Sequence, residues 1–353
     1  MYQNIRIEGL RALDHVQMDG LRRVNLLVGK NNVGKTTVLE GLLLLGGGTN
    51  PGMLLTLGLM RGQRLDRSRP DPEPIWRSFS HEFQDGRVIE IAGRWGAEPR
   101  ERGLKITRDI SQFTSEVDDE QTVARALGES RLNGVSFEYS GSDGVLVRTS
   151  ARVEDGELRT SGNKDRRDFI RTVLVSARAR TFEREADQHG HLLRTKRERP
   201  VLDAIRLLDE RIQRLEIVHE SGAPAIYCDI GFPTLAPLTV CGDGVVRMFS
   251  FVVELTAVSG GVLLVDEIDA GLHYSVMVPF WRTLRELAEQ HDVQIFATTH
   301  NDDLLRSALA AFGDDLSWFR LHRLDRRAQG IVAVGYDDDA LAAARDERFE
   351  VRG

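Results

Sequence analysis

The sequence Gly29-Lys30-Asn31-Asn32-Val33-Gly34-Lys35-Thr36 decides the fold class of this chain. An apolar run over 24–28, broken only by Asn25, precedes it as a buried strand would, and residues 37–43 follow it as a helix would. The order strand, glycine-rich loop, helix is the context in which this pattern binds phosphate. Backbone N–H groups and the positive end of the helix dipole converge on phosphate oxygens in such a loop. The sequence therefore predicts a nucleotide-binding loop.

Individual residues of this loop have distinct expected roles. Gly29 and Gly34 allow backbone N–H groups to converge on phosphate oxygens, and Lys35 supplies a mobile cation for the β- and γ-phosphates of ATP. Thr36 is an expected ligand of Mg²⁺ through its hydroxyl group. The other loop residues that we expect at the nucleotide are Asn31, Asn32, Val33 and Thr37. A glycine-rich turn that matches the pattern by chance is the alternative, and the flanking strand and helix oppose it.

A second motif predicts the metal side of the same site. Residues 262–265 are all apolar, and Asp266 and Glu267 follow them directly. Such a run is typical of a buried strand in a parallel sheet, whose carboxyl end carries polar residues into a ligand crevice. We expect Asp266 to hold Mg²⁺, directly or through water, and Glu267 to orient or deprotonate an attacking water. The alternative is an acidic strand-to-loop turn without a catalytic role.

A third strand, expected over 293–298, ends in Thr299 and His300. One helix, expected over roughly 275–290, separates it from the strand that ends in Asp266, so the two strands should lie side by side. His300 would then lie at the same sheet edge as the γ-phosphate, where it could sense that group and help to hold the water near Glu267. A single histidine at a strand end is often only a satisfied polar residue, and the sequence leaves this alternative open.

Composition and charge limit the classes of protein to which the chain can belong. It has 353 residues, 41% hydrophobic and 29% charged, which is enough for one large core plus an elaboration. Its two cysteines, Cys228 and Cys241, are not at a metal-ligand spacing and suit a reducing cytoplasm. The N-terminus has no signal region, and no apolar run approaches the roughly 18 residues of a membrane span. A net charge of −7 argues against indiscriminate nucleic-acid binding but allows local basic patches. We therefore expect a cytoplasmic protein with no membrane partner.

The chain is expected to form one domain over 1–353, with an insertion between the two parts of its core. The core is expected at 1–50 and 165–353, and a β-rich, variable insertion at 51–164. The glycines at 46–48 should end the helix that follows the loop, and residues 172–176 predict a strand that begins the second part of the core. Short β-rich runs separated by Gly, Asp and Ser turns predict an antiparallel meander between about 87 and 160, with a helix over 116–127.

A helical lever is expected over 178–220. Its apolar residues repeat at spacings of 4, 3, 4 and 3, as one stripe on a helix would: Val201, Ile205, Leu208, Ile212 and Leu215. That helix either packs on its own domain or forms a short coiled-coil arm, and the sequence does not decide between them. Between 178 and 199, basic residues outnumber acidic ones, which is typical of a solvated face and also compatible with contacts to nucleic-acid phosphates.

Taken together, these motifs resemble those of ABC-type ATPase heads. The resemblance is carried by the Asp266-Glu267 pair, by Asp-Ala-Gly-Leu-His at 269–273 and by Thr299-His300. The opening Ile-Arg-Ile-Glu-Gly-Leu-Arg-Ala-Leu at 5–13, the Gly-Lys-Asn-Asn form of the loop and the segment 241–247 resemble the ATPases related to the overcoming-lysogenisation-defect (OLD) nucleases. RecF and the structural-maintenance-of-chromosomes heads are more distantly similar. The resemblance covers about 1–50 and 165–353. It implies an α/β P-loop NTPase of ABC-ATPase type, with a mixed central sheet, an antiparallel β subdomain and a helical insertion.

The resemblance also implies a homodimer in which two heads enclose ATP. Gly242, Asp243 and Gly244 would begin a helix over 245–256 whose N-terminus points at the γ-phosphate of the partner, and residues 269–272 would line the dimer seam. Transporter-type ABC proteins have a Ser-Gly-Gly core where this chain has Gly-Asp-Gly, so a serine contact to the γ-phosphate is not expected here. The glutamine that usually links the Mg²⁺ site to the lever is not identified by the sequence. Its candidates are Gln63, Gln84 and Gln112.

The function that the resemblance implies is slow hydrolysis of Mg·ATP as a conformational switch. It would act in DNA repair or in defence against phage, with a separate effector protein, because no nuclease signature follows residue 300. One alternative is a RecF-like clamp that binds DNA directly under the control of ATP. The other is the motor subunit of a membrane transporter, which the missing Ser-Gly-Gly core and the form of the N-terminal segment oppose.

Overall fold

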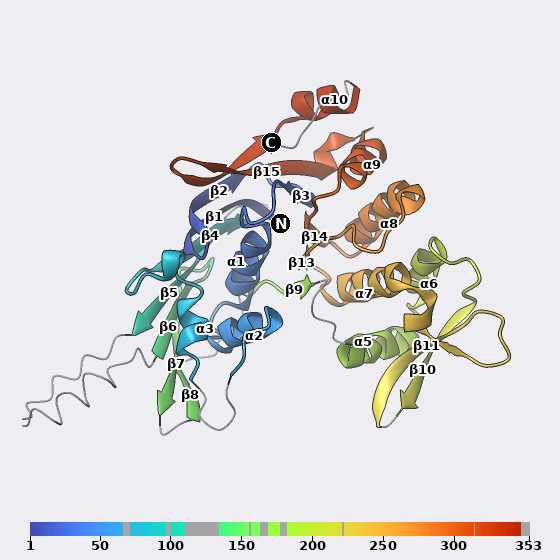
Figure 1. Cartoon of the computed structure of the whole chain (residues 1–353), viewed down its shortest axis with the longest axis horizontal. Helices are drawn as coiled ribbons and strands as arrows, with labels where there is room; N and C mark the ends of the chain where they lie inside the picture. The colour runs from blue at the N-terminus through green and yellow to red at the C-terminus, as the bar shows by residue number, and fades with distance from the viewer. Residues whose placement is uncertain are drawn as a thin grey trace, which may run out of the picture.

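A mixed central sheet with helices on both faces, and a second sheet beside it, organise the chain (Figure 1). The computed structural model describes residues 1–65, 71–96, 100–109, 134–154, 157–162, 169–176, 182–220, 222–313 and 315–346. The helix expected over 116–127 and the candidate Gln112 lie outside the described residues. So do Arg178 and Arg180 of the basic segment.

The central sheet has the strand order β16-β15-β3-β14-β13-β9. All of its neighbouring strands are parallel except the edge pair of β15 and β16, which is antiparallel. The bounds are β3 (Val24–Val28), β9 (Thr172–Val175), β13 (Val262–Val265), β14 (Gln294–Thr298), β15 (Phe319–Arg327) and β16 (Gly330–Tyr336). The expectation that β13 and β14 lie side by side is confirmed. The carboxyl ends of β3, β9, β13 and β14 therefore meet at one edge of the sheet.

Side chains of these strands alternate between two hydrophobic cores, as the two-residue period of a strand requires. Leu263 and Val265 pack in one core with three helices, α7 (Asp243–Ala257), α8 (Met277–Gln290) and α9 (Asp302–Phe312). Leu264 packs in the other core with α1 (Lys35–Gly47). Asn25 is fully buried in β3, and its side chain is satisfied because it accepts from the Arg22 N–H at 2.8 Å and donates to the carbonyl of Ile295 at 3.2 Å.

The second sheet is antiparallel and covers α1 from the other side. Its order is β2-β1-β4-β5-β6-β7-β8, which confirms the predicted meander and joins it to the N-terminal hairpin. The bounds are β1 (Tyr2–Leu10), β2 (Leu13–Asp19), β4 (Ile89–Trp95), β5 (Arg100–Asp109), β6 (Gly134–Ser140), β7 (Leu146–Glu154) and β8 (Glu157–Gly162). Two short helices, α2 (Gly52–Met60) and α3 (Glu73–Arg77), connect α1 to this sheet. The first strands of the chain and the expected insertion thus share one sheet.

The expectation of one long helix through 201–215 is wrong. The structure has α5 (Phe182–Thr195), then α6 (Arg199–Arg206), and the chain turns before β10 (Arg214–Glu220), which pairs with β11 (Ala223–Asp229). The guanidinium of Arg206 closes the turn by donating to the carbonyls of Ile212 and Gln213 at 2.7 and 2.8 Å. The apolar stripe still packs into the core with α7, because helix, turn and strand face the same side. The spacing of the apolar residues shows that their side chains face the same core. It does not show that one continuous helix carries them.

Several shorter elements complete this framework, among them the 3₁₀ turns η1 (His81–Phe83), η3 (Tyr274–Val276) and η4 (Leu316–Trp318). Two residues of β12 (Ala236–Pro237) pair with β11, a 3₁₀ turn η2 (Leu238–Cys241) leads into α7, and α10 (Asp338–Asp346) follows β16. Figure 1 shows α6 beside α7, and α5 and the β10–β11 hairpin below α7, on the side opposite the second sheet. None of the helices in the described ranges combines the length and apolar character that crossing a membrane requires.

Candidate nucleotide site

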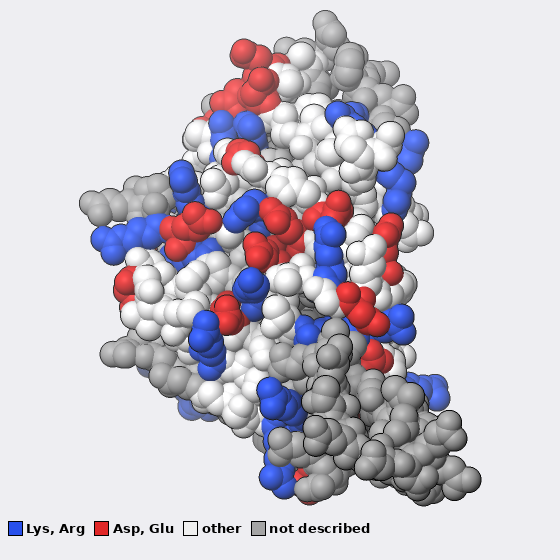
Figure 2. Space-filling view, turned by 90° about the vertical axis from the view of Figure 1, so that its left-hand side faces the viewer, with Lys and Arg blue, Asp and Glu red and all other residues white. Residues whose placement is uncertain are grey.

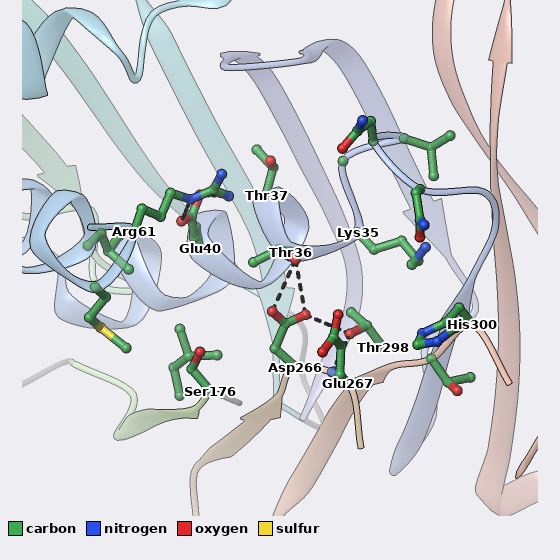
Figure 3. A pocket seen from close by; sticks show the side chains of 18 residues that line it. Lys35, Thr36, Thr37, Glu40, Arg61, Ser176, Asp266, Glu267, Thr298 and His300 are labelled. Carbon is green, nitrogen blue, oxygen red and sulfur yellow. Dashed lines mark hydrogen bonds and ion pairs between the residues drawn. The ribbon is translucent and has the colours of Figure 1, made fainter. Parts of the chain in front are cut away.

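A cavity of about 450 Å³ lies at the sheet edge where β3, β9, β13 and β14 end. The loop residues 31–37 line it, as the sequence predicts. Asp266, Glu267 and His300 reach it from the ends of β13 and β14, and Figure 3 shows these side chains turned toward Lys35 and Thr36. Gly29 begins the loop but is not among the lining residues. The structure thus brings together residues that lie at opposite ends of the sequence.

The phosphate-binding loop has the backbone shape that a cradle for an anion requires. Gly34 has φ of 85°, which strains any residue with a side chain, and a Cβ atom at this position would also lie 2.6 Å from Leu13 Cδ2, so the position favours glycine. The Lys35 ammonium donates to the carbonyls of Gly29 and Lys30, at 2.6 and 2.9 Å. Lys35 is also the first residue of α1, so the positive end of the helix dipole points into the cavity. Loop shape, lysine and helix end therefore suit the phosphates of a nucleotide.

Three oxygen-bearing side chains form the metal side of the cavity. The Thr36 hydroxyl donates to the two oxygens of Asp266, at 3.0 and 3.2 Å, and the Thr298 hydroxyl donates to Asp266 Oδ1 at 2.7 Å. A hydroxyl and a carboxylate oxygen this close are the donors that Mg²⁺ takes when phosphates and water complete its shell. Within the described residues, no three His, Cys, Asp or Glu side chains gather closely enough to hold a metal by themselves. The residues present fit a nucleotide-bound Mg²⁺.

Glu267 is held in an unusual backbone conformation directly after Asp266. Its φ is 51°, in the left-handed region that non-glycine residues rarely adopt. Its N–H donates to the Thr298 hydroxyl at 2.8 Å, and its carbonyl accepts from the Arg247 guanidinium at 2.7 Å. Arg247 is buried in α7 and also donates to the carbonyl of Asp266 at 3.1 Å. The backbone turn at Glu267 is therefore held by hydrogen bonds from both β14 and α7.

His300 is an exposed residue at the rim of the same cavity. Just before it, the buried Thr299 hydroxyl donates to the carboxylate of Asp269 at 2.6 Å. The side chain of Asp269 therefore points inward and fixes the end of β14. The position of His300 beside Lys35 and Glu267 agrees with the sequence prediction, and its role stays a prediction.

Sequence reasoning missed several residues at the cavity. Thr298 and Ser176 line it from the ends of β14 and β9. Glu40 and Arg61 lie across the cavity from His300 (Figure 3). The carboxylate of Glu40 is buried and accepts from Arg61 at 2.5 and 3.0 Å. A threonine at the end of an apolar strand could have indicated Thr298 as a site residue. The Glu40–Arg61 pair could not be predicted in this way, because it results from packing between α1 and α2.

A partly buried arginine completes the group around Glu40. Arg11 lies 3.1 Å from the Glu40 carboxylate and stacks over Phe79, 3.9 Å from the ring centroid. Burial lowers the pKa of Arg11 to about 10, and the negative charge of Glu40 opposes this shift. Neither Gln63 nor Gln84 lines the cavity, so the linking glutamine is not identified among the described candidates.

The predicted signature segment lies outside the cavity of its own chain. Gly242 and Asp243 are exposed at the start of α7. Gly244 packs against the segment that follows Glu267, because a Cβ atom there would lie 2.3 Å from the carbonyl of Gly271. The segment is thus fixed by an internal contact on one side and open to solvent on the other.

Comparison with known proteins agrees with this geometry. Residues 24–306 match the family described as AAA domain, putative AbiEii toxin, Type IV TA system. The chain belongs to this AAA domain family. Over 206 residues it is 24% identical to the DNA double-strand break repair Rad50 ATPase of Methanopyrus kandleri. That match covers 55% of this chain and only 20% of the Rad50 protein, so the chain spans about a fifth of that relative.

A second relative matches nearly the whole of this AAA domain protein. It is an ATP/GTP phosphatase of Helicobacter pylori, 18% identical over an alignment of 337 positions that covers 86% of this chain and 86% of that protein. Among solved structures, an SMC head bound to the C-terminal winged-helix domain of ScpA superposes with a TM-score of 0.50 and 13% identity, covering 95% of this chain and 97% of that one.

An SMC head with an extended coiled coil, bound to the C-terminal domain of ScpA derived from Pyrococcus furiosus, also has a TM-score of 0.50, with 11% identity and 99% coverage of both chains. At these identities the two SMC structures establish the fold alone. The predicted P-loop NTPase fold of ABC-ATPase type is therefore confirmed.

Proposed function

We propose that this chain binds Mg·ATP, hydrolyses it slowly and uses it as a dimerising switch. The observation that carries the proposal is the single cavity into which Lys35, Thr36, Asp266, Glu267 and His300 all converge (Figure 3). A cradle for phosphates, a pair of oxygen ligands and an additional carboxylate are the parts that phosphoryl transfer to water needs. The ATP/GTP phosphatase relative, which matches over most of its length, supports the same chemistry.

Each residue has a defined part in the proposed reaction. The backbone N–H groups of the loop and the Lys35 ammonium bind the β- and γ-phosphates, and Lys35 exchanges its loop carbonyl acceptors for phosphate oxygens. Thr36 and Asp266 would hold Mg²⁺, which supplies positive charge that neutralises the phosphate oxygens. Glu267 orients the attacking water and accepts its proton. His300, exposed at the rim, contacts the γ-phosphate and helps to hold that water.

A second copy of the chain would complete the site. Gly242 and Asp243 are exposed at the N-terminus of a fifteen-residue helix, which is a favourable place for an anion. Because these residues do not line the cavity of their own chain, we propose that they face the γ-phosphate bound to a partner. The internal contact between Gly244 and Gly271 would carry the segment 269–272 to the same seam.

The proposed biological role is that of a cytoplasmic ATPase related to the OLD and RecF ATPases, acting in DNA repair or anti-phage defence with a separate effector protein. The family description and the similarity to a Rad50 ATPase named for break repair support this role. A RecF-like clamp that binds DNA directly is the second candidate, favoured by the Rad50 similarity alone. It predicts DNA affinity that requires ATP and falls with added salt.

The charge distribution favours an effector protein over direct DNA binding. Lysine and arginine are interspersed with aspartate and glutamate across the face in Figure 2. On the second sheet, several basic residues lie within 4 Å of an acidic neighbour, including Arg148 with Glu138 and Lys105 with Glu90. Such paired charges leave less positive potential to attract nucleic-acid phosphates.

Replacing Glu267 with glutamine tests the proposal. The amide keeps the shape of the side chain and removes the charge that orients water, so turnover should fall at least about 100-fold while ATP binding stays within a few-fold of the parent. Trapped ATP should then accumulate in a dimer, which size-exclusion chromatography with light scattering detects. Glu289→Gln, which alters an exposed carboxylate on α8, is the matched control. Turnover at the parent rate in Glu267→Gln would show that Glu267 is not the catalytic carboxylate.

A further inference from the structure

The two cysteines of the chain lie in contact, although they are thirteen positions apart in sequence. Cys228 Sγ and Cys241 Sγ are 3.1 Å from each other, and both residues are free thiols. Cys228 is fully buried in β11, and Cys241 is half-buried at the end of η2. The chain has no other cysteine, so the contact uses all of its thiols.

The strand pairing explains why these thiols meet. Cys228 on β11 lies opposite Ala236 on β12, and its thiol donates to the carbonyl of Ala236 at 3.3 Å. The 3₁₀ turn η2 begins directly after β12 and brings Cys241 back over the same strand. The contact therefore follows from regular secondary structure and needs no rearrangement of the backbone around it.

The pair lacks the features of a metal site. Within the described part of the chain, no third His, Cys, Asp or Glu side chain joins the two thiols in a group that could hold a metal ion. A disulfide needs only two sulfur atoms at about 2.05 Å, roughly 1 Å closer than these thiols are. In proteins of reducing compartments, such bonds are usually transient and redox-sensing.

We infer that Cys228 and Cys241 are a redox modification site, at which a reversible disulfide fixes the segment before α7. The oxidant would be a peroxide. The Cys241 thiolate attacks one peroxide oxygen and breaks the O–O bond, which gives a sulfenic acid and, after protonation, water. The Cys228 sulfur then attacks the sulfur of the sulfenic acid, the Sγ–Sγ bond forms, and a second water leaves with the thiol proton. A peroxide is reduced to two waters while two thiols are oxidised.

The order of these steps follows from exposure. Cys241 is accessible to a solvent-borne oxidant, whereas Cys228 is sealed in the core. Burial and the contact with Cys241 raise the pKa of the Cys228 thiol to about 12, so Cys228 is a poor nucleophile toward peroxide in solution. Its sulfur lies 3.1 Å from Cys241 Sγ, and the high effective concentration of this contact offsets the small thiolate fraction, so Cys228 acts as the resolving thiol.

The location of the pair gives the disulfide a consequence. Cys241 directly precedes Gly242, whose φ is 103° and whose surroundings are open to solvent. The bond would tie η2 to β11 and limit movement of Gly242 and Asp243 at the start of α7. If these residues face a partner's nucleotide, which rests on the proposed function, oxidation should slow ATP turnover several-fold by hindering closure of the dimer.

The test begins with the reduced, intact protein exposed to hydrogen peroxide and quenched by alkylation. Peptide mass spectrometry should find Cys228 linked to Cys241, with loss of two hydrogen atoms that a thiol reductant restores. In Cys228→Ser, the same treatment should leave Cys241 as a sulfenic acid that a 1,3-dicarbonyl reagent traps. In Cys241→Ser, Cys228 should remain reduced. These measurements involve no nucleotide.

Two results would overturn the assignment of the site. One is over-oxidation of Cys241 to a sulfinic acid while Cys228 remains available to alkylation after unfolding. The other is disulfides that link separate chains only. ATP turnover, compared between the reduced and oxidised protein, tests the consequence separately, and equal rates would refute it. If the reduced protein had no ATP turnover at all, the proposed function would be contradicted. The mass spectrum would still show whether the disulfide between Cys228 and Cys241 forms.

Discussion

Thr298 offers the sharpest test of how the site is held together. Its buried hydroxyl donates to Asp266 Oδ1 at 2.7 Å and accepts from the Glu267 N–H at 2.8 Å. Thr298→Val keeps the shape and removes both hydrogen bonds. An unsatisfied N–H costs about 1–3 kcal/mol when it is buried, and the Glu267 N–H is partly buried; the bond to a carboxylate is worth about 1.5–3 kcal/mol. We therefore expect the free energy of unfolding to fall by about 3 kcal/mol.

A larger effect is expected on metal binding than on folding. Loss of a group that orients a metal ligand typically weakens metal affinity about 10–100-fold. The concentration of Mg²⁺ that gives half-maximal ATP turnover should rise by that factor in Thr298→Val and return toward the parent value in Thr298→Ser. Urea unfolding, measured on the same samples, gives the loss in stability.

Ser307→Ala is the matched control for Thr298→Val. The Ser307 hydroxyl is also buried and donates to the carbonyl of Leu304 at 2.7 Å, within α9 and outside the residues that line the cavity. This variant should lose about 1 kcal/mol of stability with no change in Mg²⁺ dependence. An unchanged Mg²⁺ dependence in Thr298→Val would refute the argument that Thr298 positions Asp266.

Three further predictions address the nucleotide, the dimer and pH. Lys35→Ala should weaken ATP binding sharply in calorimetry while leaving the apo fold intact, and unchanged affinity would contradict the nucleotide site. Asp243→Arg should block a site shared between two chains without disturbing the cavity of its own chain. Mixing this variant with Lys35→Ala should therefore restore hydrolysis from two inactive parents, because one of the two shared sites is then built from unmutated halves. Turnover at the parent rate by Asp243→Arg alone would refute the dimer. Burial, with Arg320 nearby, lowers the pKa of His322 to about 4, so between pH 6.5 and 4 the unfolded chain binds more protons and stability falls with falling pH. From pH 6.5 to 5, the parent should lose about 1.6 kcal/mol more than His322→Asn in urea unfolding, and equal losses would show that the pKa of His322 is not lowered in the folded protein.

Asp243 suits the mixing experiment better than the neighbouring Gly244, because a side chain at Gly244 would disturb its own chain. An arginine at Gly244 would collide with the carbonyl of Gly271 in the same chain, so inactivity would not report on a dimer. Asp243 is exposed, and a change there leaves that contact in place.

The sequence predicted best what short, continuous patterns determine. The strand at 24–28, its loop and helix, and the strand before Asp266 form from neighbouring residues, and parallel pairing then brings His300 to the same edge. The network around Glu40 was not predictable, because Arg11 and Arg61 reach it from separate elements. The prediction of a lever helix was wrong for a related reason. Apolar spacing indicates which side chains are buried, and the apolar residues before and after the turn at 207–213 face the same core, so their spacing does not reveal the turn.

The backbone of Glu267 places stability and activity in opposition. A non-glycine residue in the left-handed region costs about 1–2 kcal/mol, and glycine or asparagine adopts this conformation more easily. In the proposed reaction, the same position needs a carboxylate. Selection of variants for heat resistance alone should therefore enrich glycine or asparagine at position 267, and the most thermostable proteins recovered would include ones that bind ATP and no longer turn it over.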